Sequence, residues 1–255
     1  MPKKKFGQNF LLNNDLCIQI VKLEKIKNHN ILEIGPGNMA LTKNIINEKP
    51  KKFFAVEIDS DLIKENQNNI TSKYLINEDA IKINELNLFC KEKFKIISNL
   101  PFNISAQLLV KWIKIQNNYN CIDSMTLMFQ KELAERITAK HNSKKYGRIT
   151  ILSNAFFKIE KKLYVDKKNF YPIPKIDAEV LQFTPHKKNK INKEQFSKLE
   201  KLTLLFFNER RKKNIKKIKE IFSDQKIKEF NLDKYFDMRP ENLSSELYYY
   251  LTKIL

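Results

Sequence analysis

The sequence contains few cysteines and no long apolar run, and each absence excludes a class of protein. Its three cysteines, Cys17, Cys90 and Cys121, are far apart and not in CxxC spacing, so neither a disulfide framework nor a thiolate zinc site is expected. No stretch approaches the roughly 18–20 uncharged apolar residues that cross a bilayer. The first residues lack the apolar core of a secretory signal. We therefore expect a cytoplasmic protein with no membrane partner.

Histidine and acidic residues are scarce as well. The three histidines, His29, His141 and His186, form no cluster with metal-ligand spacing, so no metal site is expected. There are 48 Lys and Arg residues against 29 Asp and Glu, for a net charge of +19, and only five of the basic residues are Arg. The codon bias of an AT-rich genome accounts for part of this excess. A pI near 9.6 still indicates a polyanionic partner, of which nucleic acid is the first candidate.

Strand-like and helix-like segments alternate between residues 31 and 184. Strands are expected at 31–34, 53–57, 74–77, 94–98 and 124–129. Helices are expected at 39–47, 60–69 and 103–116, with Ser60 as an N-cap. This alternation is typical of βαβ units in a mostly parallel sheet. Two later β-rich stretches, 154–165 and 179–184, predict a terminal hairpin that adds an antiparallel strand.

The pattern changes after Pro185. The segment at 187–190 (KKNK) is a candidate linker, and the rest of the chain has only helical spacing of apolar residues, at 194–207, 213–222 and 243–254. The sequence therefore predicts an α/β, Rossmann-like domain over residues 1–185 and a small all-helical domain over residues 186–255.

The turn after the first strand carries the clearest signal of a site. Gly35-Pro36-Gly37 forms a tight turn whose backbone can approach a ligand closely. The third glycine of the dinucleotide fingerprint is missing, which favours a nucleoside-type cofactor over a pyrophosphate. Glu57 ends the second predicted strand, at the sequence spacing from the glycine turn at which an acid binds ribose hydroxyls. Asp79 ends the third, where it could meet the edge of an adenine. Together they suggest S-adenosylmethionine, although the glycines could instead only shape a turn and the acids could be solvated.

The fourth strand ends in Asn99-Leu100-Pro101-Phe102, which suits methyl transfer to an exocyclic adenine amine. That nitrogen is a poor nucleophile because its lone pair is delocalised into the ring. An amide oxygen and a backbone carbonyl can accept both N–H bonds and direct the lone pair at the sulfonium methyl, while Phe102 offers a ring for stacking. Catalysis would then come from positioning. The alternative is a turn that ends a strand with a buried Phe.

With these residues in place, the sequence resembles the ribosomal RNA adenine dimethyltransferases of the KsgA family over essentially its whole length. The order and spacing of the matching segments identify this family far more specifically than the glycine turn alone. The segments are Phe6–Leu11, Glu33–Gly37, Glu57–Asp59, Glu78–Ala80, Asn99–Phe102, Ser143–Arg148, Phe170–Asp177 and Phe207–Lys212.

The resemblance implies an S-adenosylmethionine-dependent methyltransferase with a mostly parallel seven-stranded sheet that contains one antiparallel strand. An N-terminal segment, residues 1–12, would cover the cofactor. The cofactor contacts would be Asn9, Leu11, Gly35, Gly37, Glu57, Asp79, Ala80 and Asn99. The catalytic segment would be Asn99, Leu100, Pro101 and Phe102, with Phe102 and Phe170 stacking on the target base. Core packing remains the alternative for Phe170, and Phe102 replaces the family's more usual Tyr, which keeps a ring and loses a hydroxyl.

The substrate implied by the resemblance is a pair of adjacent adenines in a hairpin loop near the 3′ end of small-subunit (16S) rRNA. Each would be dimethylated, with S-adenosylhomocysteine as by-product. We expect a monomer that acts on an assembly intermediate of the small subunit. The basic run at 210–219 predicts phosphate contacts, with a solvated helix face as the alternative. The candidate contacts are Arg210, Arg211, Lys212, Lys213, Lys216 and Lys217.

Three other functions remain open. A resistance methylase acting on large-subunit rRNA shares a similar tetrapeptide, but the GQNFL segment and Asn208–Lys212 look more like the small-subunit enzymes. A non-catalytic assembly factor would be expected to lose the cofactor acids or Asn99. A DNA adenine methylase is disfavoured by the small helical C-terminal domain.

Overall fold

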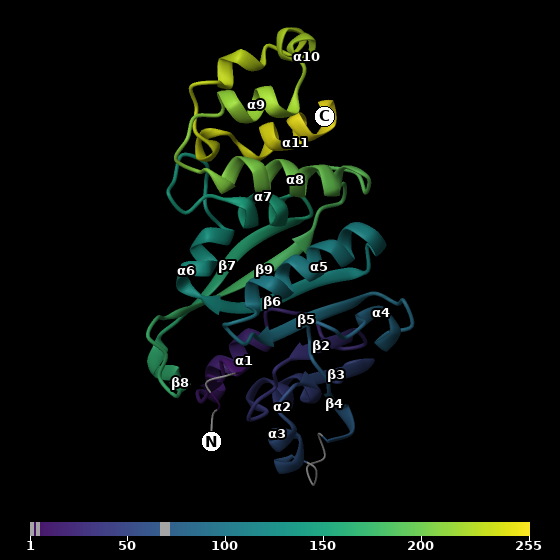
Figure 1. Ribbon diagram of the computed structural model, residues 1–255. Helices are drawn as coiled ribbons and strands as arrows, with labels where there is room; N and C mark the ends of the chain where they lie inside the picture. Colours follow the sequence, from purple (N-terminus) through teal and green to yellow (C-terminus); the bar gives the residue numbers. More distant parts are fainter. Residues whose placement is uncertain (1–2, 4–5, 67–71) are drawn as a thin grey trace. The chain divides into compact units, whose positions relative to one another are not determined.

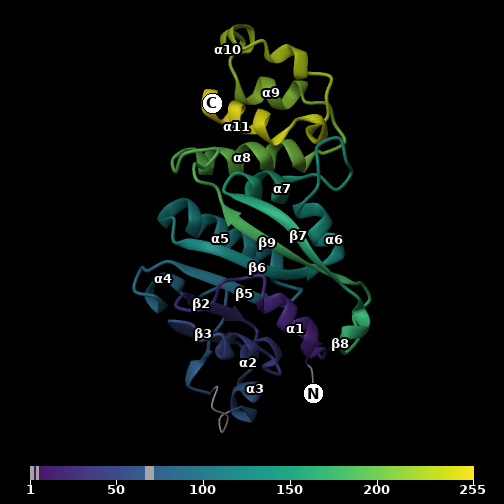
Figure 2. The same cartoon turned by 180° about the vertical axis from the view of Figure 1, so that it is seen from behind.

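The structure is a computed structural model that describes residues 3, 6–66 and 72–255 (Figures 1 and 2). It contains two compact units. The first consists of residues 1–134 and 158–185, and the second of residues 135–157 and 186–255. Part of the expected helix at 60–69, residues 67–69, and residues 1–2 and 4–5 of the N-terminal segment lie outside the described residues.

A seven-stranded sheet forms the centre of the first unit, with the strand order β4-β3-β2-β5-β6-β9-β7. Neighbouring strands from β4 to β6 pair in parallel, and β9 pairs with β6 in the antiparallel sense. The predicted mostly parallel sheet with an antiparallel strand is therefore confirmed. The strands are β2 (Asn30–Ile34), β3 (Lys52–Glu57), β4 (Leu75–Asn77), β5 (Phe94–Asn99), β6 (Ile122–Gln130), β7 (Phe157–Val165) and β9 (Ala178–Pro185).

Both faces of this sheet are covered. Ile31, Phe53 and Ile97 are buried in one apolar cluster together with residues of α1 and α2. Their neighbours along the strands, Leu32 and Ile96, point to the opposite face and are fully buried as well. Burial on both faces explains why these strands read as continuous apolar runs rather than as alternating ones.

The helices between the strands agree with the sequence patterns, except at one cap. Asp59, not Ser60, caps α3, because the Asp59 side chain accepts a hydrogen bond from the Asp61 N–H at 3.2 Å while Ser60 is already the first helical residue. The predicted Ser60 cap is wrong by one residue. The helices are α1 (Asn14–Val21), α2 (Ala40–Asn47), α3 (Ser60–Glu65), α4 (Glu85–Leu88), α5 (Ser105–Tyr119) and α6 (Lys131–Ile137), with 3-10 turns at Ser72–Tyr74 and Lys167–Asn169.

A short two-stranded ribbon brings the N-terminal segment to the loop before β9. β1 (Phe10–Leu11) pairs with β8 (Phe170–Tyr171) in the antiparallel sense, so that Phe10 faces Tyr171 and Leu11 faces Phe170. The Leu12 N–H continues the ladder by donating to the Asn169 carbonyl at 2.9 Å. This ribbon joins two segments that are far apart in the sequence.

The second unit is helical and has an aromatic core. Phe206 of α8 packs on Tyr248 of α11 with ring centroids 5.6 Å apart, and the Tyr249 hydroxyl donates to the Ile151 carbonyl of α7. Residues 135–157 therefore pack with the C-terminal helices, whereas a single boundary after residue 185 would place them with the sheet. The helices are α7 (Arg148–Asn154), α8 (Gln195–Asn208), α9 (Ile215–Ile221), α10 (Asp224–Glu229) and α11 (Ser245–Ile254), with 3-10 turns at Leu232–Tyr235 and Pro240–Asn242.

Candidate active site

The turn after β2 favours glycine at two positions. Gly35 and Gly37 have φ angles of +66° and +55°, in the left-handed region that side chains disfavour. A Cβ atom on Gly37 would lie 2.8 Å from the Phe10 ring, and one on Gly35 would lie 3.2 Å from Pro101. The backbone of this turn therefore lies against both the N-terminal segment and the segment that follows β5.

Glu57, at the end of β3, holds the turn in place. Its Oε2 accepts from the Gly37 N–H at 3.3 Å, and its Oε1 accepts from the Asp59 N–H at 2.9 Å. The side chain is only 6% exposed. Burial raises the pKa of Glu57 above its usual range, although these N–H donors oppose the shift.

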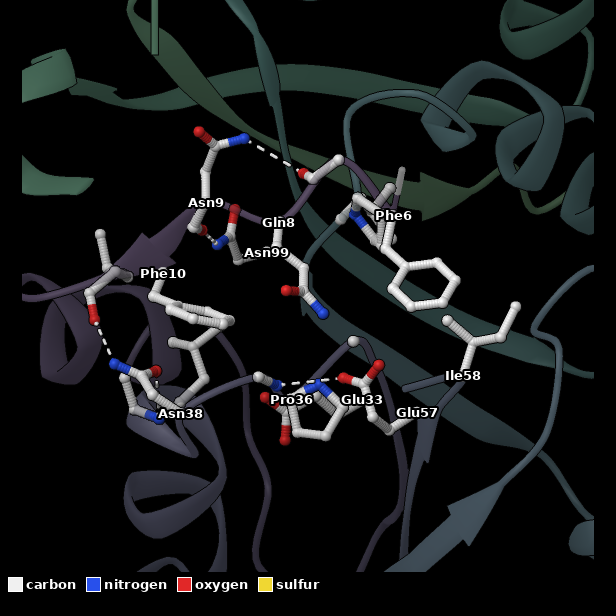
Figure 3. A pocket seen from close by; sticks show the side chains of 18 residues that line it. Phe6, Gln8, Asn9, Phe10, Glu33, Pro36, Asn38, Glu57, Ile58 and Asn99 are labelled. Atoms are coloured by element: carbon white, nitrogen blue, oxygen red, sulfur yellow. Dashed lines mark hydrogen bonds between the residues drawn. The ribbon is translucent and has the colours of Figure 1, made fainter. Parts of the chain in front are cut away.

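Two adjoining cavities lie along the ends of the strands, and Figure 3 shows the larger one. The larger encloses about 550 Å³ and the smaller about 270 Å³, both counted with the open solvent at their mouths. Of the predicted site residues, those lining the larger cavity are Asn9, Leu11, Gly35, Gly37, Glu57, Asn99, Leu100 and Pro101. Those lining the smaller cavity are Gly35, Glu57, Asp79, Ala80 and Pro101. The shared lining makes the two cavities parts of one groove.

Asn99 points one amide atom at the N-terminal segment and leaves the other unused. Its Nδ2 donates to the Asn9 carbonyl at 3.0 Å (Figure 3). Its Oδ1 is buried and has no hydrogen-bond partner among the described residues. A buried acceptor without a donor is costly, so its retention indicates an atom kept for a ligand.

The N-terminal segment is fastened over the groove at both ends. At one end Leu11 is buried, and its carbonyl accepts from Asn38 Nδ2 at 3.2 Å. At the other, Lys3 Nζ and Gln8 Nε2 donate to the two oxygens of Asp59 at 2.5 and 2.9 Å. Burial alone would raise the pKa of Asp59, but these hydrogen bonds hold it below its usual range. The Asp59 side chain thus links the N-terminal segment to the loop that follows Glu57.

Phe102 and Phe170 do not line either cavity. Phe102 is half-buried, and its ring meets Phe170 edge-on, with centroids 6.2 Å apart. Phe170 is 1% exposed and belongs to the apolar cluster beneath α1 and α2. Stacking of Phe170 on a base would require its ring to be uncovered, so this geometry favours the core alternative and the stacking role stays a prediction.

The basic run of the second unit contains three kinds of side chain. Five members are exposed, namely Arg211, Lys212, Lys213, Lys216 and Lys219. Arg210 is half-buried, and it donates from Nε to Glu241 at 2.6 Å and from Nη2 to the Ser143 carbonyl at 3.1 Å. Lys217 is 3% exposed, and its Nζ donates to the Glu209 and Lys212 carbonyls; burial lowers its pKa. Arg210 and Lys217 therefore stabilise the loop that carries Arg211, Lys212 and Lys213.

Sequence reasoning missed several residues of the groove. Glu33 lies in the middle of the buried strand β2 and lines the larger cavity, where Thr42 Oγ1 donates to its Oε2 at 2.7 Å. An acid inside an otherwise apolar strand was the available signal. Gln8 and Lys3 had no such signal, because their partner Asp59 is more than fifty residues away in the chain.

Glu33 predicts a pH dependence of stability. Burial raises its pKa to about 8, against the Thr42 hydrogen bond and with a smaller contribution from the charge of Glu57. The unfolded chain ionises this group near 4.5. The native state therefore holds an extra proton between these values, and stability falls as pH rises through this window. We expect Glu33→Gln to remove this fall. In thermal unfolding between pH 5 and 9, the stability of the variant relative to that of the parent protein should rise with pH up to about pH 8. Melting temperatures of the two proteins that change in parallel with pH would contradict this role of Glu33.

Among the residues that the structure describes, no group of three or more His, Cys, Asp and Glu side chains is placed to hold a metal ion. Within the same part of the chain, no helix is long and apolar enough to cross a bilayer.

Comparison with known proteins decides the family. The model of the ribosomal RNA adenine dimethylase family matches residues 2–255. The chain belongs to this family. Ribosomal RNA small subunit methyltransferase A of Pelagibacter ubique is 40% identical, with 98% of this chain and 95% of that protein covered. The protein of the same name from Mycoplasmopsis pulmonis is 37% identical, with 98% and 97% covered.

Solved structures show the same fold as this adenine dimethylase. A dimethyladenosine transferase from Plasmodium falciparum is 26% identical with a TM-score of 0.74, and 95% of each chain is covered. The 23S rRNA methyltransferase ErmE is 20% identical with a TM-score of 0.73, covering 96% of this chain and 99% of its own. This second likeness shows the fold alone. The expected Rossmann-like methyltransferase fold is confirmed.

Proposed function

We propose that the protein dimethylates the N6 atoms of two adjacent adenines in a hairpin loop near the 3′ end of small-subunit rRNA, with S-adenosylmethionine as methyl donor. The observation that carries the proposal is the buried, unpaired Oδ1 of Asn99 at the edge of the groove. Family membership and the names of the relatives support the reaction and the substrate. The protein is proposed to act as a monomer on an assembly intermediate, in the cytoplasm.

The groove suits S-adenosylmethionine, which supplies an electrophilic methyl group on sulfur when it is bound. Gly35 and Gly37 line the groove and are proposed to lie against the methionine part of the cofactor. Glu57 is proposed to accept hydrogen bonds from the ribose hydroxyls, and Asp79 and Ala80 line the cavity proposed for adenine. Asn9 and Leu11 close the groove from the N-terminal segment. The carboxylate of Glu57, which lines both cavities, is proposed to add negative potential, which favours a cation such as the sulfonium.

Asn99 acts on the target base by positioning. Its free Oδ1 accepts one N–H of the adenine amine, and the carbonyl of Leu100 is proposed to accept the other. These two bonds draw the nitrogen toward tetrahedral geometry and turn its lone pair toward the methyl group. Pro101 fixes the turn against Gly35, and the half-buried ring of Phe102 supports the base. The proton leaves the nitrogen after transfer, so no general base is required.

The exposed part of the basic run is the proposed phosphate contact, and it gives a specific prediction. We expect replacement of Arg211, Lys212 and Lys216 by Ala to weaken small-subunit binding and to reduce the salt slope of log K by about 2–3, at about 0.7–0.9 per phosphate contact. Cofactor affinity should not change. Binding measured at several salt concentrations tests this, with the exposed Lys198, Lys201 and Lys228 replaced by Ala as a charge-matched control.

An equal loss of small-subunit affinity in the control variant would show that only net charge matters, and it would contradict a specific phosphate contact. Arg210 and Lys217 are left in place because their hydrogen bonds hold the loop, so their loss would confuse folding with binding.

Transfer of tritiated methyl groups from S-adenosylmethionine tests the function as a whole. Small subunits from a strain that lacks the modification are incubated with the protein, and large subunits are incubated in parallel. Label in the small subunit alone is the expected result. Label in the large subunit would move the protein to the resistance methylases, and no label in either, with cofactor binding shown separately, would favour an assembly factor.

A further inference from the structure

Large apolar side chains are exposed along the β1–β8 ribbon and the loop that follows it. Tyr171, Ile173 and Ile176 are 56%, 63% and 37% exposed, and Leu12, the residue after β1, is 60% exposed. We call these four residues the ribbon patch. Scattered apolar residues on a surface are ordinary, but a group on one segment beside a ligand groove marks a contact surface.

Strand alternation places Tyr171 on the exposed face of the ribbon and Phe170 on the buried face. Leu11 and Phe170 pair across the ribbon and are both buried, so they share its inner face. Phe10 and Tyr171 form the next pair and share the other face. Phe10 lines the larger cavity, and its ring points into it in Figure 3. Tyr171 is therefore the exposed aromatic ring directly beside a residue of the groove.

The charges around the patch suit a nucleic acid. Lys167, Lys168 and Lys175 are exposed on the same segment. The acids of this segment are engaged with its backbone, since Asp166 accepts from the Lys168 N–H at 2.8 Å and Asp177 accepts from the Lys167 N–H at 3.1 Å. Aromatic rings interleaved with lysines are how proteins hold unpaired nucleotides, because bases stack on the rings while the lysines neutralise phosphates.

We propose that the Tyr171 ring stacks on the unpaired base next to the adenine being methylated and holds that nucleotide outside the groove. The proposal rests on the proposed function and adds a second base position to it. Two adjacent adenines cannot occupy one groove together, so the one not being methylated must lie beside it. On the inner face of the ribbon, the Phe170 ring contacts the Phe102 ring. Tyr171, the next residue in the chain, has an exposed ring on the other face of the ribbon.

Methyl transfer to unmodified small subunits by Tyr171→Ala and Tyr171→Phe tests the proposal. The Phe variant keeps the ring and is expected to retain the parent KM within about twofold. The Ala variant is expected to raise the KM for subunits about tenfold, the loss of one base stack, with the cofactor Kd unchanged. Tyr119→Ala is the matched control, because Tyr119 is 59% exposed at the end of α5, away from the groove residues.

A second readout reports stacking itself. Small subunits assembled with 2-aminopurine in place of the neighbouring adenine should lose fluorescence when the parent protein or Tyr171→Phe binds, and keep it with Tyr171→Ala. Unchanged KM and unchanged quenching in the Ala variant would overturn the proposal, as would a Phe variant that behaves like Ala. The fluorescence measurement needs only binding, so it judges the stacking even if the parent protein transfers no methyl group.

Discussion

Asn99→Ala is expected to lower the rate of methyl transfer about 10²–10³-fold, the effect of removing one preorganised polar group from a reacting centre. The side chain supplies the one acceptor in the groove that is buried and unpaired among the described residues. Without it, the adenine amine keeps its planar geometry and its lone pair is not directed at the methyl group. Binding of the small subunit should be nearly unchanged, because the phosphate contacts lie elsewhere in the chain.

Single-turnover rates at saturating cofactor and subunit measure this loss directly. Asn99→Asp is the informative companion, since it keeps an acceptor oxygen but cannot donate to the Asn9 carbonyl as Asn99 does. We expect its rate to lie between those of Asn99→Ala and the parent protein. Turnover near the parent value in Asn99→Ala would refute catalysis by this amide.

Glu57→Ala is expected to weaken cofactor binding about 10²–10⁴-fold. Two hydrogen bonds from ribose hydroxyls to a carboxylate would be lost, and each is worth about 1.5–3 kcal/mol. The Gly37 and Asp59 N–H groups would also lose their acceptor, which loosens the turn against which the cofactor lies. Titration calorimetry with S-adenosylhomocysteine checks the loss without turnover.

Glu65→Ala is the control, because Glu65 is an exposed acid on the next helix. Circular dichroism shows whether each variant folds. A dissociation constant for Glu57→Ala within about twofold of the parent value would remove Glu57 from the cofactor site.

The position of the groove could be predicted from the sequence because it follows from sheet geometry. Gly35, Glu57 and Asn99 each end or follow a parallel strand, and the carboxyl ends of neighbouring parallel strands meet at one edge. Once the strands are recognised, residues at their ends must lie together. The GxG turn could be recognised without tertiary information, since the local backbone conformation favours glycine at both positions.

The closing segment could not be predicted in the same way. The contacts of Lys3 with Asp59 and of Leu11 with Phe170 join residues that no local pattern relates. Phe170 shows the limit clearly, because a motif identifies the segment but not which side of a two-residue strand is buried. Within the basic run, Arg210 and Lys217 look like their exposed neighbours in the sequence, and only their partners show that they are structural.

Product analysis tests the central claim most directly. Small subunits that lack the modification are incubated with the protein and S-adenosylmethionine, and their rRNA is then digested and examined by mass spectrometry. The expected product is N6,N6-dimethyladenosine at two adjacent positions near the 3′ end, formed about 10²–10³-fold more slowly by Asn99→Ala. A monomethylated product alone, a methyl group on another base, or dimethylation by Asn99→Ala at the parent rate would contradict the proposed reaction at this site.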